Sequence, residues 1–334
     1  MLLEIKNLKV HFKTDYGVVK AVDGVNLSLK KGEILGIVGE SGSGKSMLSL
    51  ATMKMIPKNG TIAEGSINYT SEKGTIDLIK LKSNSKEMRK LRGNDIAMIF
   101  QEPMSSLNPV YTIGYQIYES LFQEKGMTKS KAKKHAVEML EAVGIVPAEK
   151  RLNQYPHELS GGMRQRVMIA LALCRNPSLL IADEPTTALD VTIEAQIIDL
   201  IKMLQKKLNT SVIFISHDLG VIGEIADSIV IVYMGQVVEQ GNCLKIFTKP
   251  KHPYTAALLK SIPEIGHKDR LYSIKGSVPS PYELPEGCYF EPRCSHSIAK
   301  CKKEKPPEVR LSDDHRVKCW LHCKCEAKEQ PNGK

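Results

Sequence analysis

The chain contains the run Gly39-Glu40-Ser41-Gly42-Ser43-Gly44-Lys45-Ser46, which matches the phosphate-binding pattern Gly-x4-Gly-Lys-Ser. An apolar segment, Ile34 to Val38, precedes the run and predicts a strand, and residues Lys45 to Met55 predict a helix. Glycines let backbone N–H groups wrap a phosphate, Lys45 supplies a point charge, and the Ser46 hydroxyl can ligate Mg²⁺. A flexible turn is the alternative, but the flanking strand and helix disfavour it. We therefore expect a nucleotide site that uses Gly39, Ser41, Gly42, Ser43, Gly44, Lys45 and Ser46.

A second run, Leu179-Leu180-Ile181-Ala182-Asp183-Glu184, predicts an apolar strand that ends in two acids. In phosphate-loop folds such a strand lies beside the loop, so Asp183 is predicted to hold Mg²⁺ and to hydrogen-bond Ser46. Glu184 can then polarise an attacking water. An acidic pair after a strand is also typical of a helix N-cap or a solvated turn.

The run Leu159-Ser160-Gly161-Gly162-Met163-Arg164-Gln165-Arg166 lies upstream of this strand. Ser160 and two glycines before a helix expected from Met163 to Arg175 form a second anion site of bare backbone N–H groups. Here the chain resembles the ATPases of ABC transporters, whose signature is LSGGQ, with Met163 in place of the usual Gln. The resemblance implies that Ser160, Gly161 and Gly162 of one subunit close over the γ-phosphate held by another, so that two ATP molecules lie between two ATPase domains.

Three further landmarks of that family follow in order, so the resemblance covers residues 2–262. Gln101 ends the expected strand Ile96 to Phe100 and matches the Q-loop, whose amide ligates Mg²⁺ or the water. Asp190, in Ala188-Leu189-Asp190, matches the D-loop at the dimer seam, and His217 matches the switch histidine that contacts the γ-phosphate. A lone histidine after a strand is otherwise more often structural.

An aromatic residue near the N-terminus is expected to stack on adenine. Tyr16 is our candidate because it stands before Gly17 and the expected strand Ala21 to Leu29, with Phe12 as the alternative.

Composition agrees with an ATPase subunit that buries a sizeable core, since 42% of the 334 residues are hydrophobic. No apolar run approaches the ~20 residues that cross a bilayer, and Met1 to Lys6 reads as a strand rather than a signal peptide. The net charge of +10 is scattered among acids rather than gathered with aromatics, so a basic face near anionic lipid is favoured over nucleic acid.

Alternating strand and helix patterns predict an α/β fold, and the resemblance implies a phosphate-loop ABC ATPase with a RecA-like core, an antiparallel β subdomain and a helical signature subdomain. We assign residues 1–262 to the ATPase domain, with the helical subdomain at about 103–175. Its helices are expected at Thr112 to Gln123 and Lys129 to Val143. Met104 to Pro109 resembles the stretch by which peptide-importer ATPases meet their membrane subunits. The helix Val191 to Leu208 carries an apolar stripe for core packing.

The run Lys251-His252-Pro253-Tyr254-Thr255, before a helix expected from Thr255 to Ser261, resembles the tail of oligopeptide and dipeptide importer ATPases. Such ATPases carry a cysteine-bearing extension, here residues 263–334. Composition alone reads this extension as a poorly ordered linker, because it is rich in Pro and charge. Met163 and the run Gln165 to Ala170 are more similar to the D-type than to the F-type subunit of these importers.

Six of the eight cysteines follow Gly287, and four of them form Cys288-x5-Cys294-x6-Cys301-x17-Cys319. Thiolates gathered in this way favour zinc or an iron–sulfur centre, although reduced structural thiols stay an alternative. Zinc sites usually contain a C-x2-4-C pair, which these four lack, whereas iron–sulfur ligation tolerates varied spacing. The resemblance implies a 4Fe-4S cluster on these four residues. Cys323 and Cys325 are possible substitutes for Cys319, Cys174 is expected in the core, and Cys243 has no visible partner.

Taken with the resemblance, these observations predict the energy-coupling ATPase of a dipeptide or oligopeptide importer that uses ATP and Mg²⁺. The implied partners are two transmembrane permease subunits, a second ATPase that is F-type or a copy of this chain, and indirectly an extracytoplasmic peptide-binding protein. The chain would then lie on the cytoplasmic face of the membrane as a peripheral subunit. Alternatives are an importer of nickel or another solute, a soluble ABC ATPase acting on DNA or ribosomes, and a redox module in which ATP is regulatory.

Overall fold

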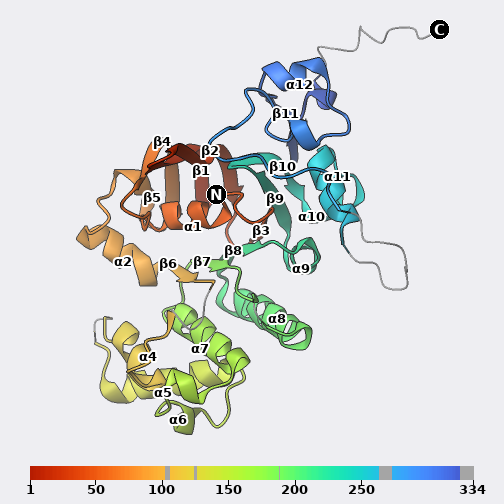
Figure 1. Cartoon of the computed structure of the whole chain (residues 1–334). Coiled ribbons are helices and arrows are strands. Elements are labelled where there is room, and N and C mark those ends of the chain that lie inside the picture. The colour runs from red at the N-terminus through yellow and green to blue at the C-terminus, as the bar shows by residue number, and fades with distance from the viewer. Residues whose placement is uncertain (102–105, 124–125, 188, 263–272, 324–334) are drawn as a thin grey trace, which may run out of the picture.

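The computed structural model describes residues 1–101, 106–123, 126–187, 189–262 and 273–323, and these form two β-sheets with helices around them (Figure 1). In the described residues, the larger sheet has eight strands in the order β11-β12-β10-β9-β3-β8-β7-β6. Its parallel part consists of β3 (Ile34–Val38), β6 (Ile96–Ile99), β7 (Leu179–Asp183), β8 (Ser211–Ser216) and β9 (Ser228–Tyr233). Their continuous apolar runs are buried on both faces, as parallel strands require.

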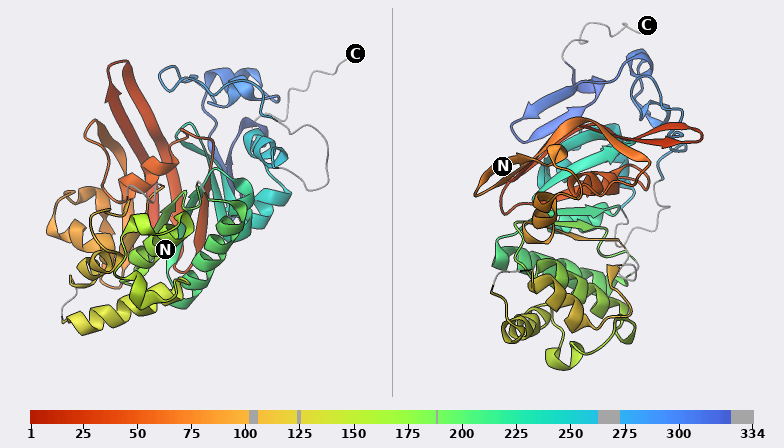
Figure 2. Two further views of the ribbon diagram at one scale, coloured as in Figure 1. Left: turned by 60° about the horizontal axis from the view of Figure 1, so that its bottom comes forward. Right: turned by 90° about the vertical axis from the view of Figure 1, so that its left-hand side faces the viewer.

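A four-stranded antiparallel sheet lies against the central sheet, with α1 between the two (Figure 2). Its order is β2-β1-β4-β5, from β1 (Leu3–Thr14), β2 (Gly17–Leu29), β4 (Gly60–Ser71) and β5 (Gly74–Asp77), and β5 leads into a short 3-10 turn, η1 (Leu78–Lys80). Helix α1 (Lys45–Thr52) contacts both β2 and β7. The apolar side chains of both sheets and of α1 form one core cluster, so the phosphate loop that precedes α1 is held from two sides.

The segment between β6 and β7 is helical and lies at the end of the molecule opposite the C-terminal extension (Figure 1). It contains α4 (Ile113–Leu121), α5 (Lys129–Ala142), α6 (Ala148–Arg151), the turn η2 (Pro156–Glu158) and α7 (Gly161–Leu173), and α2 (Lys86–Asn94) precedes β6. The expected start of α7 at Met163 was wrong. The Ser160 side chain accepts a hydrogen bond from Met163 N (3.3 Å), which starts the helix at the first glycine after this cap.

The remaining helices cover the central sheet, and α8 (Val191–Leu208) has the predicted bounds. Its stripe of Ile197, Ile198, Ile201 and Leu204 is buried, as the sequence predicted. The others are α9 (Leu219–Ile225), α10 (Cys243–Thr248) and α11 (Pro253–Lys260). Helix α11 begins earlier than expected because the His252 side chain accepts from Tyr254 N (3.0 Å) and Pro253 suits the first helical position. None of the described helices is both long and apolar enough to span a bilayer.

The described part of the C-terminal extension is folded, in contrast to the linker that its composition suggests. It contains η3 (Glu291–Arg293), α12 (Ala299–Lys303), β11 (Glu308–Ser312), β12 (His315–Lys318) and η4 (Trp320–His322). Strand β12 pairs antiparallel with β10 (Gln236–Asn242), so the extension continues the central sheet. At this junction the buried Glu239 carboxylate accepts hydrogen bonds from Lys251 N, His252 N and His315 Nε2, each at 2.8 Å.

A second junction ties the extension to β2 through the buried carboxylate of Asp23. It accepts hydrogen bonds from Gln236 Nε2 (3.0 Å) on β10 and from Tyr289 OH and Lys305 Nζ (2.8 Å each) in the extension. Burial alone would raise the pKa of Asp23, but these hydrogen bonds outweigh burial and hold its pKa well below the ordinary value.

Candidate nucleotide-binding site and cysteine pocket

The phosphate loop runs from the end of β3 to Gly44, which caps α1 with a φ of 97°. A Cβ at Gly44 would lie 2.1 Å from Ala21 O, so the loop requires glycine there. Lys45 Nζ donates to Gly39 O (2.7 Å) and Glu40 O (3.0 Å) and so lies over the loop. The Ser43 hydroxyl is buried with no hydrogen-bond partner among the described residues. A polar atom left in this way fits a loop that takes a phosphate ligand.

Asp183, at the end of β7, accepts the predicted hydrogen bond from Ser46 Oγ at 3.2 Å. Burial raises the pKa of Asp183, and the hydrogen bond from Ser46 opposes this. Burial likewise lowers the pKa of Lys45, and the nearby carboxylates of Glu184, Asp183 and Glu40 oppose it. The half-buried Ser46 hydroxyl thus contacts the buried Asp183 carboxylate, and the buried Lys45 ammonium lies over the phosphate loop. A divalent cation would compensate the charge of Asp183, and a phosphate would compensate that of Lys45.

The remaining predicted catalytic side chains lie around the Glu184 carboxylate. Its Oε2 accepts from Gln101 Nε2 (3.0 Å) and Thr187 Oγ1 (3.0 Å) and lies 3.3 Å from His217 Nδ1. Its Oε1 lies 4.0 Å from Lys45 Nζ. Glu184 has a φ of 47°, a conformation that costs a non-glycine residue about 1–2 kcal/mol. Such strain is typical of functional positions, and the cluster can hold and orient a water for attack on a phosphate.

The signature residues lie at the surface. Ser160 and Gly161 are exposed at the N-terminus of α7, and Gly162 packs close to Ile193, since a Cβ there would meet Ile193 Cγ2 at 3.0 Å. Asp190 is also exposed and caps α8 by accepting from Ile193 N (3.0 Å). The described hydrogen bonds do not join these residues to the phosphate loop of the same chain. They therefore form a separate exposed face, while Ala188 of the D-loop motif lies outside the described residues.

Tyr16 lies in the turn between β1 and β2 and is 85% exposed, whereas Phe12 packs against the core under Gly60. Tyr282 of the extension stands edge-on to Tyr16, with ring centroids 6.1 Å apart, and its OH is 3.4 Å from Thr14 Oγ1. Exposure makes Tyr16 the more accessible of the two predicted stacking residues.

The four predicted cysteines, Cys288, Cys294, Cys301 and Cys319, line one small pocket with His252 and Trp320. Burial raises the pKa of Cys288 to about 11 and that of Cys319 to about 12, and the other thiols add to both shifts. Within the described residues, no group of three or more His, Cys, Asp or Glu is arranged to hold a metal ion. Cys301 and Cys319 are buried, whereas Cys288 and Cys294 are half-buried.

Among the described residues, the other cysteines do not line this pocket. Cys323 is not among the described residues that line it, and its thiol is 3.8 Å from Cys319 O. Cys174 is buried at the end of α7, as predicted, and Cys243 lies 3.8 Å from Gly223 O. Cys325 lies outside the described residues.

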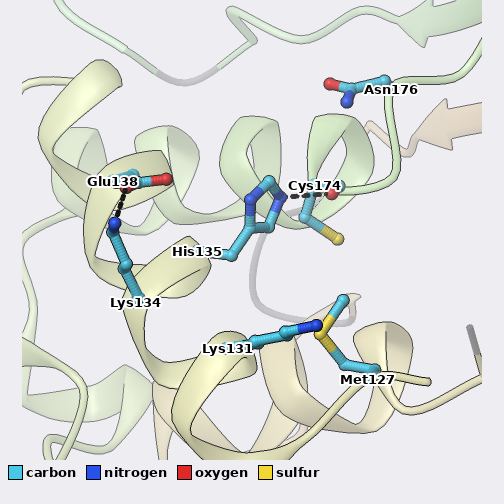
Figure 3. A pocket seen from close by; sticks show the side chains of 7 residues that line it. All are labelled: Met127, Lys131, Lys134, His135, Glu138, Cys174 and Asn176. Carbon is cyan, nitrogen blue, oxygen red and sulfur yellow. Dashed lines mark hydrogen bonds and ion pairs between the residues drawn. The ribbon is translucent and has the colours of Figure 1, made fainter.

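A hollow on the helical segment is separate from the nucleotide site (Figure 3). It lies between α5 and the end of α7, where His135 Nε2 is 2.7 Å from Cys174 O and Lys134 pairs with Glu138 at 3.9 Å. The sequence predictions placed Cys174 in the core and assigned no role to His135, Lys134 or Glu138.

Sequence reasoning also missed several residues around the site. Thr187 follows the acid pair by three residues and could have been found as a neighbour of Glu184. Tyr282 and Arg293 come from the extension, and Arg293 pairs with Glu40 inside the phosphate loop. No local pattern links residues so far apart in the chain.

Comparison with known proteins shows the family to which the chain belongs. The model described as "ABC transporter" matches residues 22–187, and that described as "Oligopeptide/dipeptide transporter, C-terminal region" matches residues 238–301. The chain is 52% identical to the oligopeptide transport ATP-binding protein OppD of Bacillus subtilis (strain 168), over 96% of this chain and 88% of that protein. It is 47% identical to the dipeptide transport ATP-binding protein DppD of Escherichia coli (strain K12), over 95% and 96%.

The fold agrees with a solved cassette. The dimeric post-hydrolysis structure of the ATP-binding cassette MJ0796, bound to ADP and Pi, matches with a TM-score of 0.62 and 30% identity, over 72% of this chain and 98% of that one. The chain therefore belongs to the ABC transporter family of ATP-binding proteins, and it is an ATPase subunit of that class. The predicted α/β ABC ATPase fold is thereby confirmed.

Proposed function

We propose that this chain is the ATP-hydrolysing subunit of a membrane importer for dipeptides or oligopeptides. The observation that carries the catalytic part is the convergence of Lys45, Gln101 and His217 on Glu184, beside the Ser46–Asp183 pair. Support for the substrate class is the likeness to peptide transport ATP-binding proteins over almost the whole chain. These relatives do not favour the nickel importer or the soluble DNA- or ribosome-directed ATPase.

Each residue has a distinct role in this proposal. Backbone N–H groups of Gly42 to Lys45 bind phosphate oxygens, and the Lys45 ammonium offsets their charge. Asp183 and Ser46 hold Mg²⁺, which supplies neutralisation of charge on the phosphates when it is bound. Glu184 accepts a proton from the attacking water or orients it, while Gln101 and His217 hold that water in line.

The exposed signature residues support pairing of this chain with a second ATPase subunit. Ser160, Gly161, Gly162 and Asp190 would close over the nucleotide of a second ATPase subunit, F-type or identical, and closure would move two membrane subunits between states. The chain would then lie at the cytoplasmic face of the membrane as a peripheral subunit, and a peptide-binding protein would deliver the solute. We assign residues 1–262 to the ATPase domain, 103–175 to its helical subdomain and 263–334 to the extension.

Peptide uptake by proteoliposomes tests the proposal. The full chain is reconstituted with its membrane subunits and partner ATPase, and uptake of a labelled dipeptide is followed with ATP inside. Glu184→Gln should keep ATP binding but reduce hydrolysis and uptake by about 100-fold or more, as loss of a catalytic base does. Glu194→Gln, in the first turn of α8, is the matched control. Rapid hydrolysis by the Glu184 variant would remove this residue from the catalytic role.

We further propose that Cys288, Cys294, Cys301 and Cys319 hold a 4Fe-4S cluster, with zinc as the alternative. The support is that these four thiols line a single pocket and that soft thiolates favour such centres. Anaerobic purification with iron, sulfide and zinc analysis distinguishes the two. Serine at any of the four should discharge the metal, while Cys243→Ser should retain it. Full retention in one of the four variants would show that the ligand set is different.

A further inference from the structure

The C-terminal extension reaches into the phosphate loop through one ion pair. Arg293, at the end of η3, donates from Nη1 to Glu40 Oε2 (2.7 Å) and from Nη2 to Glu40 Oε1 (3.0 Å). The Arg293 side chain is 4% exposed and that of Glu40 is 27% exposed. A bidentate, largely buried ion pair of this kind fixes the orientation of both side chains and favours the charged form of each.

The extension and the central sheet hold the guanidinium in place. Arg293 Nε donates to Lys275 O (3.3 Å), and Nη1 also lies 3.4 Å from Tyr233 OH. Its Cζ atom lies 5.8 Å from the centre of the Tyr233 ring and 6.0 Å from that of Phe290. Arg293 is therefore positioned by its own surroundings and not only by Glu40.

Glu40 is in turn bound through its backbone to the catalytic lysine. Glu40 O accepts from Lys45 Nζ (3.0 Å) and Ser43 N (3.2 Å), and Glu40 N donates to Tyr254 OH (3.0 Å) on α11. Glu40 therefore contacts Arg293 through its carboxylate and the Lys45 ammonium through its carbonyl oxygen.

We propose that Arg293 is a positioning residue of the nucleotide site, which holds the Glu40 carboxylate and sets the affinity of the phosphate loop for the nucleoside triphosphate. Without Arg293, an unpaired carboxylate would remain in a loop that must bind a highly charged anion, and the two would repel each other. This inference rests on the proposed binding of ATP at the loop. It makes the extension a part of that site rather than an appendage.

The test measures binding of ATP and ADP, with Mg²⁺, to the full chain by calorimetry. Arg293→Gln should weaken ATP binding by about tenfold or more, and ADP binding by less, because ATP carries more negative charge. A role confined to folding would weaken both nucleotides equally. The double variant E40Q/R293Q should recover most of the lost ATP affinity, because it removes the unpaired carboxylate. Arg310→Gln breaks an exposed ion pair in the same extension and is the matched control.

The outcomes separate this inference from the proposed function. If the wild-type chain does not bind ATP, the proposed function is wrong. If the wild type binds but Arg293→Gln is folded and binds ATP equally well, or if E40Q/R293Q does not recover affinity, only the role of Arg293 is wrong. Should Arg293→Gln fail to fold, Arg293→Met carries the test, since it keeps an apolar stem beside the rings of Tyr233 and Phe290 but removes the charge. Wild-type ATP affinity in that chain would contradict the proposal.

Discussion

Glu184 lies where three motifs of the sequence meet, and its strained backbone is part of how it does so. Its φ of 47° follows directly after the last residue of β7, and its N–H donates to Ile215 O of β8 (3.0 Å). The turn thereby aims the carboxylate toward Gln101 and His217 instead of along the strand. The neighbouring strands hold Glu184 in this strained conformation. The strain is a free-energy cost of positioning its carboxylate.

Tyr16 is expected to stack on adenine because it is the exposed aromatic of the β1–β2 turn. Tyr16→Ala should weaken ATP binding by about 1–2 kcal/mol, the value of an aromatic stacked on a base, whereas Tyr16→Phe should bind like the wild type. Equilibrium titration with ATP measures both. Phe12→Ala should instead lower the stability of the fold, since the half-buried Phe12 ring packs against the core. Equal ATP affinity in Tyr16→Ala and Tyr16→Phe would rule out the stacking role.

The lowered pKa of His252 predicts that the stability of the fold depends on pH. Burial and the nearby His322 lower its pKa from 6.5 to about 3. Between these values the unfolded chain binds a proton that the folded chain does not, so the free energy of unfolding falls as the pH is lowered below 6.5. The loss between pH 7 and pH 5.5 should be about 1 kcal/mol.

Urea unfolding at several pH values measures this loss, with His252→Asn as the comparison. Asparagine cannot titrate but keeps an oxygen that can accept from Tyr254 N and cap α11. The variant should therefore lose less stability on acidification than the wild type. Parallel stability curves for the two chains would assign the acid sensitivity to another group.

Sequence patterns predicted most strands and helices, but not how distant segments join. Apolar runs and caps predicted β3 and α8 with their observed bounds and β7 to within one residue at its end, and the Ser46–Asp183 hydrogen bond followed from neighbouring strands. The pair of Arg293 with Glu40 could not be predicted, because 253 residues separate them and neither lies in a recognisable joint pattern. Strand β12 was missed because it has only four residues, of which Val317 alone is apolar, and its other buried residue is the polar His315.

The junction at Asp23 should contribute measurably to stability. Asp23→Asn removes the charge that Lys305 and Tyr289 face, and loss of one partner from a buried network should cost about 2 kcal/mol. Guanidinium unfolding of both chains measures the difference. Asp313→Asn, at a carboxylate that is 99% exposed, should change stability by less than about 0.5 kcal/mol. Similar losses in the two variants would mean that the Asp23 junction adds nothing specific.

In the proposed assembly, the chain contributes two incomplete halves of a nucleotide site. The phosphate loop with Glu184 forms one half, and the exposed Ser160 and Asp190 form the other on a different part of the surface. The pairing of such halves was predicted from the family resemblance rather than from physical chemistry, because one chain cannot display its own partner.

A mixing experiment tests whether the halves complement each other between copies. Lys45→Ala should abolish nucleotide binding, and Ser160→Arg should block closure while the phosphate loop still binds ATP. An equal mixture should recover about a quarter of wild-type ATPase activity, because half of random pairs are hybrids and each hybrid keeps one intact site of two. Steady-state hydrolysis of the separate and mixed chains gives the result. No recovery on mixing would show that this chain takes its signature from a different subunit.

Pairing of β12 with β10 has one more consequence, for the solubility of shortened chains. Removal of the tail would leave β10 as an exposed edge strand with unpaired backbone N–H and C=O groups. Glu239 would also lose its contact with His315. Exposed edge strands of this kind pair with strands of other chains and so cause aggregation. In the intact protein the edge strand is β11, which is short and carries charged side chains that disfavour pairing with other chains. A trimmed chain would therefore show precipitation before any defect in catalysis could be measured.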